Sequence, residues 1–210
     1  MGEQGSGNND IDGGEGDDTL IGGSGNDDIM GGSGDDLLDG KDGDDELEGG
    51  DGDDILKGGE TSSGTIFQEI LRGGRGDDLM YGGSSKTDLG GIPDSVDRNA
   101  SNFSGRLYMY GDSGDDEMWG KYEMDAEYLW GGDDDDTIHP GHTAQSVIAN
   151  GNDGDDTIYA SIATVVEEKL NGGKGDDRIN PIEYLYESDG SIDETNTQWV
   201  IDPFAGTADA

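Results

Sequence analysis

Residues 13–57 read GGEGDDTLI-GGSGNDDIM-GGSGDDLLD-GKDGDDELE-GGDGDDILK, which is one nine-residue pattern repeated without interruption. Each unit begins with glycine, carries Asp at its sixth position and carries Leu or Ile at its eighth. Glycine permits the positive φ angles of a tight turn. Alternate side chains of a strand point to opposite faces, so the eighth residue is expected to face inward between two outward neighbours. The pattern predicts stacked coils in which each unit is a six-residue turn followed by a three-residue strand.

The pattern continues beyond residue 57 with insertions between its copies. Ten copies begin at Gly13, Gly22, Gly31, Gly40, Gly49, Gly73, Gly111, Gly131, Gly151 and Gly172, and a degenerate copy spans Gln4 to Asp12 with Asn9 at its sixth position. The inward eighth residues are expected to be Leu20, Ile29, Leu38, Leu47, Leu56, Met80, Met118, Ile138, Ile158 and Ile179.

Spacing assigns the turns to two edges of the coil. Two units make one coil of 18 residues, and the later copies lie 24, 38, 20, 20 and 21 residues apart, which is one coil plus an insertion each time. Edge A is therefore defined by the turns that begin at 13, 31, 49, 73, 111, 131, 151 and 172. Edge B is defined by the turns at 4, 22 and 40, and a fourth that starts at Gly58 does not complete the motif. We expect cation binding on both edges in the N-terminal half and on edge A alone thereafter.

Composition and net charge restrict the classes of partner that the chain can bind. The chain has 210 residues, 51 of them acidic, and a net charge of −40, so nucleic acid and anionic membrane surfaces are disfavoured and a cation is favoured. No apolar run approaches the 18 residues that a spanning helix needs, so membrane insertion is not expected. A hydrophobic content of 29% with 41 glycines would by itself predict disorder. The strict period argues against disorder, and both facts agree if the chain folds only when it binds metal.

The repeat resembles the RTX (repeats-in-toxin), or hemolysin-type, calcium-binding nonapeptide. The resemblance implies an all-β fold, a right-handed parallel β-roll, in which Asp and turn carbonyls of one coil meet those of the next with a calcium ion between them. It implies the carboxylate ligands Asp18, Asp27, Asp36, Asp45, Asp54, Asp78, Asp116, Asp136, Asp156 and Asp177. The turn glycines it implies are Gly14, Gly16, Gly23, Gly25, Gly32, Gly34, Gly43, Gly50, Gly52, Gly74, Gly76, Gly114, Gly132, Gly154, Gly173 and Gly175. It also implies type I secretion and folding outside the cell.

Two regions leave the repeat. Residues 1–180 are expected to form the β-roll, and the insertion at 84–105 is expected to be a surface excursion that contains two N-glycosylation triplets, at Asn99 and Asn102. Residues 181–210 carry apolar side chains outside the repeat register and are expected to cap the last coil. No such cap precedes residue 4, so the first coil is expected to present unpaired backbone groups and to favour association.

Aromatic side chains gather in the C-terminal half. Those expected to point outward from the two strands of each coil are Tyr81, Trp119, His139 and Tyr159 on one, and Tyr108, Tyr110, Tyr128 and Trp130 on the other. Stacked coils would align them into stripes. Two interpretations remain open, a face that binds sugar or protein, and aromatics that simply pack well on strands.

No metalloprotease, nucleophile-elbow or P-loop motif occurs in the sequence, and His139 with His142 is too few ligands for a convincing zinc site. We therefore expect no enzyme in this chain.

Three functions agree with the sequence. The first function is an extracellular calcium-binding structural or adhesive module, such as a self-assembling fibre subunit. The second is the calcium-folding and secretion tail of a larger secreted enzyme or toxin. The third is a glycan-binding domain.

Overall fold

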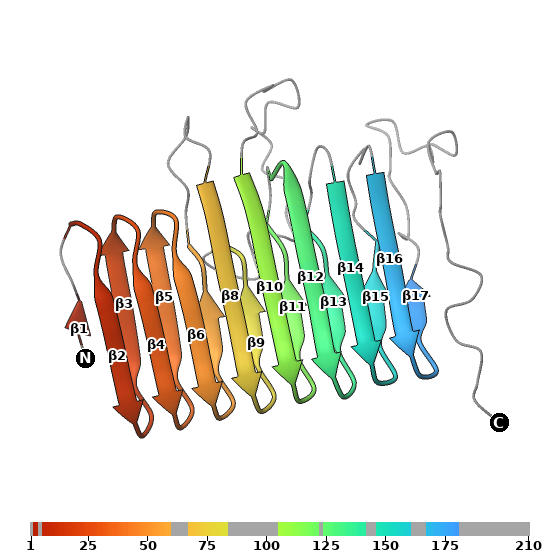
Figure 1. The fold of residues 1–210 in the computed structure, drawn as a ribbon, viewed down its shortest axis with the longest axis horizontal. Helices are drawn as coiled ribbons and strands as arrows, with labels where there is room; N and C mark the ends of the chain where they lie inside the picture. The colour runs from red at the N-terminus through yellow and green to blue at the C-terminus, as the bar shows by residue number, and fades with distance from the viewer. Residues whose placement is uncertain are drawn as a thin grey trace, which may run out of the picture.

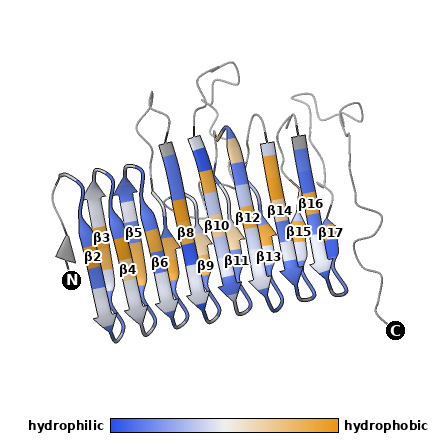
Figure 2. Cartoon of the chain, in the orientation of Figure 1, coloured by the Kyte–Doolittle hydropathy of each residue, from blue (hydrophilic) through white to orange (hydrophobic). Residues whose placement is uncertain are grey.

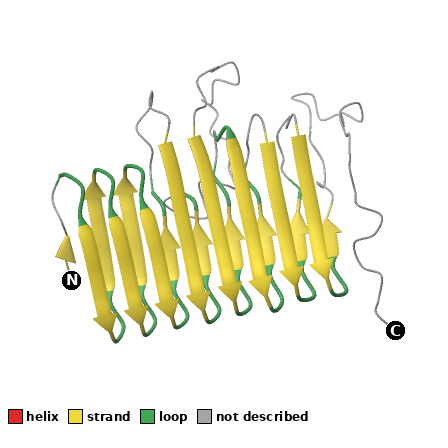
Figure 3. Cartoon of the chain, viewed as in Figure 1, coloured by secondary structure: helices red, strands yellow, loops and turns green. Residues whose placement is uncertain are grey.

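The chain forms a stack of strands and tight turns. The computed structural model describes residues 2–3, 6–59, 67–83, 105–121, 124–141, 146–160 and 167–180. The expected cap at 181–210, the sequons at Asn99 and Asn102, and nearly all of the 84–105 insertion lie outside these residues. Within the described ranges every regular element is a strand (Figure 3), and no helix there is long and apolar enough to cross a bilayer.

The strands alternate between two sheets. Their bounds are β1 Gly2–Glu3, β2 Asp10–Glu15, β3 Thr19–Ser24, β4 Asp28–Ser33, β5 Leu37–Asp42, β6 Glu46–Asp51, β7 Ile55–Lys57, β8 Phe67–Arg75, β9 Leu79–Tyr81, β10 Gly105–Ser113, β11 Glu117–Trp119, β12 Ala126–Asp133, β13 Thr137–His139, β14 Ser146–Asp153, β15 Thr157–Tyr159, β16 Glu167–Lys174 and β17 Arg178–Asn180.

Each coil contributes one strand to each sheet. The nine odd-numbered strands form one parallel sheet in the order β1-β3-β5-β7-β9-β11-β13-β15-β17, and the eight even-numbered strands form the other in sequence order. The coils therefore follow one another along a single axis, with the first coil at one end of the stack and the last described coil at the other (Figure 1). This arrangement confirms the parallel β-roll that the repeat predicted.

Strand length departs from the prediction. Strands β2 to β6 are six residues long rather than three, because the ladder continues into the first three residues of each turn. Gly14 pairs with Gly32, and Glu15 pairs with Ser33, in register with the strand residues before them. The irregular part of each unit is thus shorter than the predicted six-residue turn. The odd sheet begins before the first copy of the repeat, since β1 at residues 2–3 pairs with β3.

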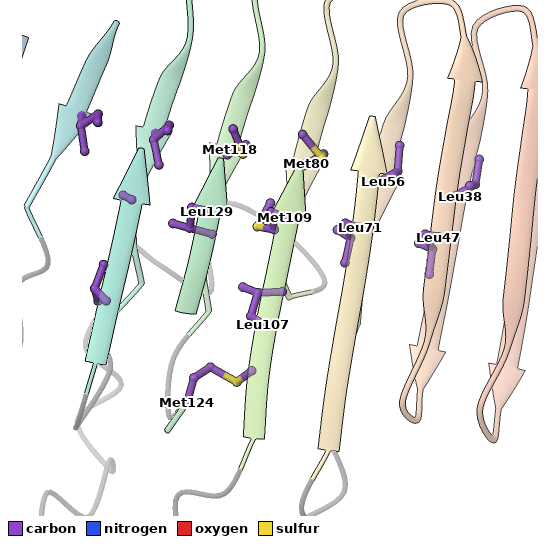
Figure 4. Close-up of a cluster of buried hydrophobic side chains, with 14 of the residues drawn as sticks. Leu38, Leu47, Leu56, Leu71, Met80, Leu107, Met109, Met118, Met124 and Leu129 are labelled. Atoms are coloured by element: carbon purple, nitrogen blue, oxygen red, sulfur yellow. The ribbon is translucent and has the colours of Figure 1, made fainter. Parts of the chain in front are cut away.

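One row of aliphatic side chains from each sheet fills the interior. All the predicted inward residues from Leu20 to Ile158 are no more than 6% exposed, and Ile179 is partly buried in the last described coil. Strands β8, β10 and β12 add Leu71, Met109 and Leu129 from the facing sheet (Figure 4). Figure 2 shows the same arrangement as a hydrophobic band across the middle of the strands, between hydrophilic turns. The interior is consequently a narrow ribbon of side chains.

Candidate functional site: two rows of buried carboxylates

The turn glycines adopt the positive φ angles that the sequence predicted. Every second- and fourth-position glycine named above as part of the implied site has a positive φ, between 94° at Gly14 and 151° at Gly43 and Gly154. L residues pay a steric cost for such angles. Lys41, Asp112, Asp134 and Asn152 nevertheless hold φ between 78° and 84° at equivalent positions. The turn shape therefore persists where the motif lacks a glycine.

Edge A carries an unbroken row of sixth-position Asp side chains. In each of them after Asp18, Oδ1 accepts a hydrogen bond from the backbone N–H of the Asp in the preceding coil, at 2.7 to 3.1 Å. The row runs through Asp18, Asp36, Asp54, Asp78, Asp116, Asp136, Asp156 and Asp177. Insertions of different length separate these residues in sequence, yet they align, which confirms the edge A assignment. The compact turns of this edge all lie along the lower side of Figure 1.

The second carboxylate oxygen of the sixth-position Asp residues is buried with no hydrogen-bond partner among the described residues. This holds for Oδ2 of Asp27, Asp36, Asp45, Asp54, Asp78, Asp116, Asp136, Asp156 and Asp177. A buried acceptor without a partner carries a desolvation cost, and a buried charge carries a larger one. A positively charged partner would therefore stabilise each of these oxygens.

The first glycine of each turn lies beside that oxygen. A Cβ built on Gly13 would lie 2.5 Å from the carbonyl oxygen of Gly31 in the next coil and 3.0 Å from Oδ2 of Asp18. The same two kinds of oxygen surround Gly31, Gly49, Gly111, Gly131 and Gly151. A carboxylate oxygen and a carbonyl oxygen thus converge where any larger residue would place its Cβ. Sequence reasoning did not single out these first-position carbonyls, because the turn glycines that the resemblance implied are those at the second and fourth positions.

Burial makes these carboxyl groups hard to ionise without a cation. Desolvation is the main cause that raises the pKa of Asp78 and Asp136 to about 8 and that of Asp116 to about 7, and neighbouring Asp charges add to it. The backbone N–H of the preceding coil acts in the opposite direction and does not compensate. Opposite charge close to such a group favours its ionised form. The row is therefore suited to a cation or, in its absence, to protons.

Fifth-position Asp residues form a parallel row in solvent. Oδ1 of Asp17 accepts from the backbone N–H of Asp35, and the pattern repeats through Asp53 and Asp77 to Asp176. These residues are exposed, in contrast to the buried sixth-position row. They add negative potential outside the buried row.

Edge B has a shorter row, and its last carboxylate is one that sequence reasoning missed. Asn9, Asp27 and Asp45 follow the edge A pattern, and the backbone N–H of Asp45 then donates to Oε1 of Glu69 at 3.1 Å. Glu69 is fully buried, and its Oε2 has no hydrogen-bond partner among the described residues. Its signal was its position two residues before the inward Leu71, the spacing that separates each Asp from its aliphatic residue. The insertion in the sequence after Gly58 concealed this spacing.

Beyond Glu69 the edge B column changes character. Strand register places Leu107, Glu127 and Val147 at the positions equivalent to Glu69 in successive coils. Both oxygens of Glu127 accept backbone hydrogen bonds, from Lys121 and Gly141 at 2.6 and 2.8 Å. Leu107 and Val147 are fully buried and apolar. At these levels the column position is either apolar or hydrogen-bonded to the backbone, in agreement with the expected loss of motif turns on edge B.

The donor set indicates the class of cation. No group of three or more Asp, Glu, His or Cys side chains converges within the described ranges. The available ligands are one carboxylate from each coil together with main-chain carbonyls. All of these are hard oxygens, the kind that Ca²⁺ takes in sets of six to eight, whereas zinc prefers His and Cys.

The outward aromatics stack as the sequence predicted. On the even sheet, Tyr108 lies 4.9 Å from Tyr128 and Tyr110 lies 4.8 Å from Trp130, between ring centroids. On the odd sheet, His139 stacks between Trp119 and Tyr159, at 3.7 and 4.3 Å. The stripes exist on both faces, and their role in binding remains a prediction.

Comparison with known proteins gives one match. The family model of the RTX calcium-binding nonapeptide repeat (4 copies) matches residues 4–38, 30–61, 63–86, 125–141 and 147–162. No curated protein and no solved structure matches the chain. The matched segments cover more than half of the chain and most of the turns that line the two carboxylate rows.

Proposed function

Because this chain belongs to the RTX calcium-binding nonapeptide repeat family, we propose that it is a non-catalytic extracellular module that folds when calcium ions fill its rows of carboxylates. The observation that carries the proposal is the column of buried Oδ2 atoms on edge A that have no hydrogen-bond partner in the described part of the chain. At Asp36, Asp54, Asp116, Asp136 and Asp156, this oxygen and a carbonyl oxygen of the next coil both lie close to the first turn glycine. A calcium ion between adjacent turns would satisfy both.

Calcium would supply charge compensation and cross-linking between coils. The sixth-position Asp of each turn would provide a carboxylate oxygen, and turn carbonyls would complete the oxygen shell. The apolar ribbon between the sheets is thin and the net charge is −40, so burial alone offers little against chain entropy and repulsion. Metal binding would then contribute directly to the free energy of folding. Calcium is abundant outside the cell, which favours an extracellular site of action.

Isothermal titration tests the calcium proposal. We expect calcium to bind to several sites per chain with a large heat of coupled folding. Magnesium should not substitute, because it demands near-ideal octahedral geometry and keeps its water. A protein that binds neither ion, or that binds both equally, would contradict the proposal.

A structural or adhesive role is the preferred use of the folded module. The motif turns are acidic along edge A and along the N-terminal part of edge B, so lateral contact there is repelled, whereas the stacked aromatic rings on the sheet faces are uncharged. End-to-end contact between copies does not close on itself and would build a fibre. Sedimentation velocity in calcium over a concentration series is the test. We expect species larger than the monomer, and a strict monomer at the highest concentration would rule out self-assembly.

The aromatic stripes favour a second candidate function, glycan binding. On the even sheet, Tyr110 stacks on Trp130, and the guanidinium of Arg72 lies 5.4 Å from the Tyr110 ring centroid. A glycan array with wild type and Trp130→Ala tests it, with Trp119→Ala on the other sheet as the matched control. Binding lost only in Trp130→Ala would support it, and no binding by wild type would reject it. The remaining alternative is the calcium-folding tail of a larger secreted enzyme or toxin, and the sequence of the full-length gene would test it.

A further inference from the structure

The acidic row of edge B ends at a buried lysine. Lys121 follows β11 and is 8% exposed, and its ammonium group donates a hydrogen bond to the carbonyl oxygen of Gly59, which follows β7. In the odd sheet β9 lies between these two strands. The Lys121 side chain therefore runs back along edge B across one complete coil, from the level of Glu127 to the level of Glu69.

The coil that the side chain crosses is apolar at this edge. A Cβ built on Gly82 would lie 3.3 Å from Cβ of Lys121 and 2.5 Å from Leu107. Leu107 occupies the column position that Asp and Glu hold in earlier coils. The aliphatic stem of a lysine suits such surroundings while its charged end seeks polar groups beyond them.

The ammonium group lies at the Gly58–Gly59 turn, which is the level of Glu69, the last carboxylate of the edge B row. Glu69 is fully buried with Oε2 lacking a hydrogen-bond partner in the described chain, and Oδ2 of Asp45 is in the same condition. Burial raises the pKa of both carboxyl groups, and the positive charge of Lys121 acts in the opposite direction on both. The Gly58–Gly59 turn keeps the motif geometry, with Gly59 at φ 103° and the carbonyl of Gly82 2.8 Å from a Cβ built on Gly58. This level thus has the carboxylate, the turn and the facing carbonyl of the other levels.

On this basis we infer that Lys121 is a built-in cation that takes the place of a calcium ion at the Glu69 level of edge B. The inference rests on the proposed function, because it assigns one level of the rows to the chain's own charge and the others to calcium. A buried charge needs a compensating partner, and a tethered ammonium provides one at any calcium concentration. The lysine would also mark the point where edge B changes from motif turns to the level of Glu127, whose carboxylate accepts its hydrogen bonds from the backbone.

Lys121→Ala tests the inference through calcium stoichiometry. Removing the ammonium leaves the carboxylate of Glu69, the carbonyl of Gly59 and space between them, so the variant should bind one more calcium ion per chain than wild type. Equilibrium dialysis against calcium with elemental analysis gives the count. The matched control is Lys169→Ala, which removes the same charge from an exposed position on β16 and should leave the count unchanged.

A second variant separates loss of the cation from loss of folding. Glu69→Gln/Lys121→Ala removes both charges, so it should fold in calcium and return to the wild-type count. An unchanged count in Lys121→Ala with intact circular dichroism would overturn the inference, as would a Lys121→Ala protein that stays unfolded in calcium. The wild-type count separately tests the proposed function, because a wild type that binds no calcium refutes that function whatever the variants do.

Discussion

At the scale of single residues, the first glycine of each turn controls access to the carboxylate. At Gly31 a Cβ would collide with Oδ2 of Asp36 and lie 2.6 Å from the carbonyl oxygen of Gly49. At Gly16, by contrast, no atom lies within 4 Å of the position that a Cβ would take, although its φ is 96°. The two glycines thus serve different needs, since one leaves room for a ligand and the other permits a backbone angle.

We therefore predict different defects from the same substitution. Gly31→Ala should block the cation position beside Asp36 and lower calcium stoichiometry. Gly16→Ala should keep the stoichiometry and cost about 1–2 kcal/mol of stability, the penalty for an L residue in the left-handed region. Calcium titration combined with urea unfolding in calcium distinguishes them. Equal stoichiometry in both variants would show that the first glycine does not border the ion.

The carboxyl pKa values predict the pH dependence of the metal-free protein. Asp78 and Asp136 have a pKa of about 8 in the fold and Asp116 about 7, all raised from 3.8 by burial. The folded chain therefore retains protons that the unfolded chain releases, so metal-free stability should fall as pH rises from about 4 to about 8. Without metal, acidification toward pH 4 should restore β structure in circular dichroism. Calcium competes with these protons, so its affinity should rise with pH. A metal-free protein whose β structure becomes more stable between pH 4 and 8 would contradict both the predicted pH dependence of stability and the predicted competition between calcium and protons.

At the scale of elements, the two edges differ in extent. The edge A row runs from Asp18 to Asp177, whereas the edge B row ends at Glu69. Cations along edge A would tie every described coil to the next. Cations along edge B would tie only the N-terminal coils.

We accordingly predict that Asp136→Ala lowers the cooperativity of calcium binding and the hydrogen-exchange protection of β12 to β17. Asp27→Ala, on edge B, should affect protection only in the N-terminal strands. Hydrogen exchange in calcium, read separately for the two halves, makes the comparison. Equal loss of C-terminal protection in the two variants would contradict the two-edge assignment.

Sequence patterning determined most of the fold and much of the candidate site. A period of nine with one inward aliphatic residue predicted the parallel coil, and the spacing between copies predicted which turns stack, since a coil plus an insertion returns to the same edge. It did not predict Glu69 or Glu127, because the segments before them lack the glycine pattern and only strand register reveals their alignment. It did not predict Lys121 either, because this residue lies outside the repeat pattern and only its hydrogen bond to Gly59 reveals its position. It also underestimated strand length, since glycines that read as turn continue the ladder. The predicted cap at 181–210 stays a prediction.

At the scale of the whole molecule, charge and core act against each other. A net charge of −40 repels itself, and the apolar interior is a single narrow band between two sheets (Figure 2). Most of the buried carboxylates that align along the edges would be costly as neighbouring anions and favourable as ligands. The account therefore makes folding depend on the ions that the rows hold.

Circular dichroism in chelator and then in millimolar calcium tests this dependence most directly. Near neutral pH, the account predicts a spectrum of a largely unfolded chain in chelator and a strong gain of β signal when calcium is added. Removal of calcium by excess chelator should reverse the gain. A protein that is fully folded in chelator and unchanged by calcium would contradict the central claim.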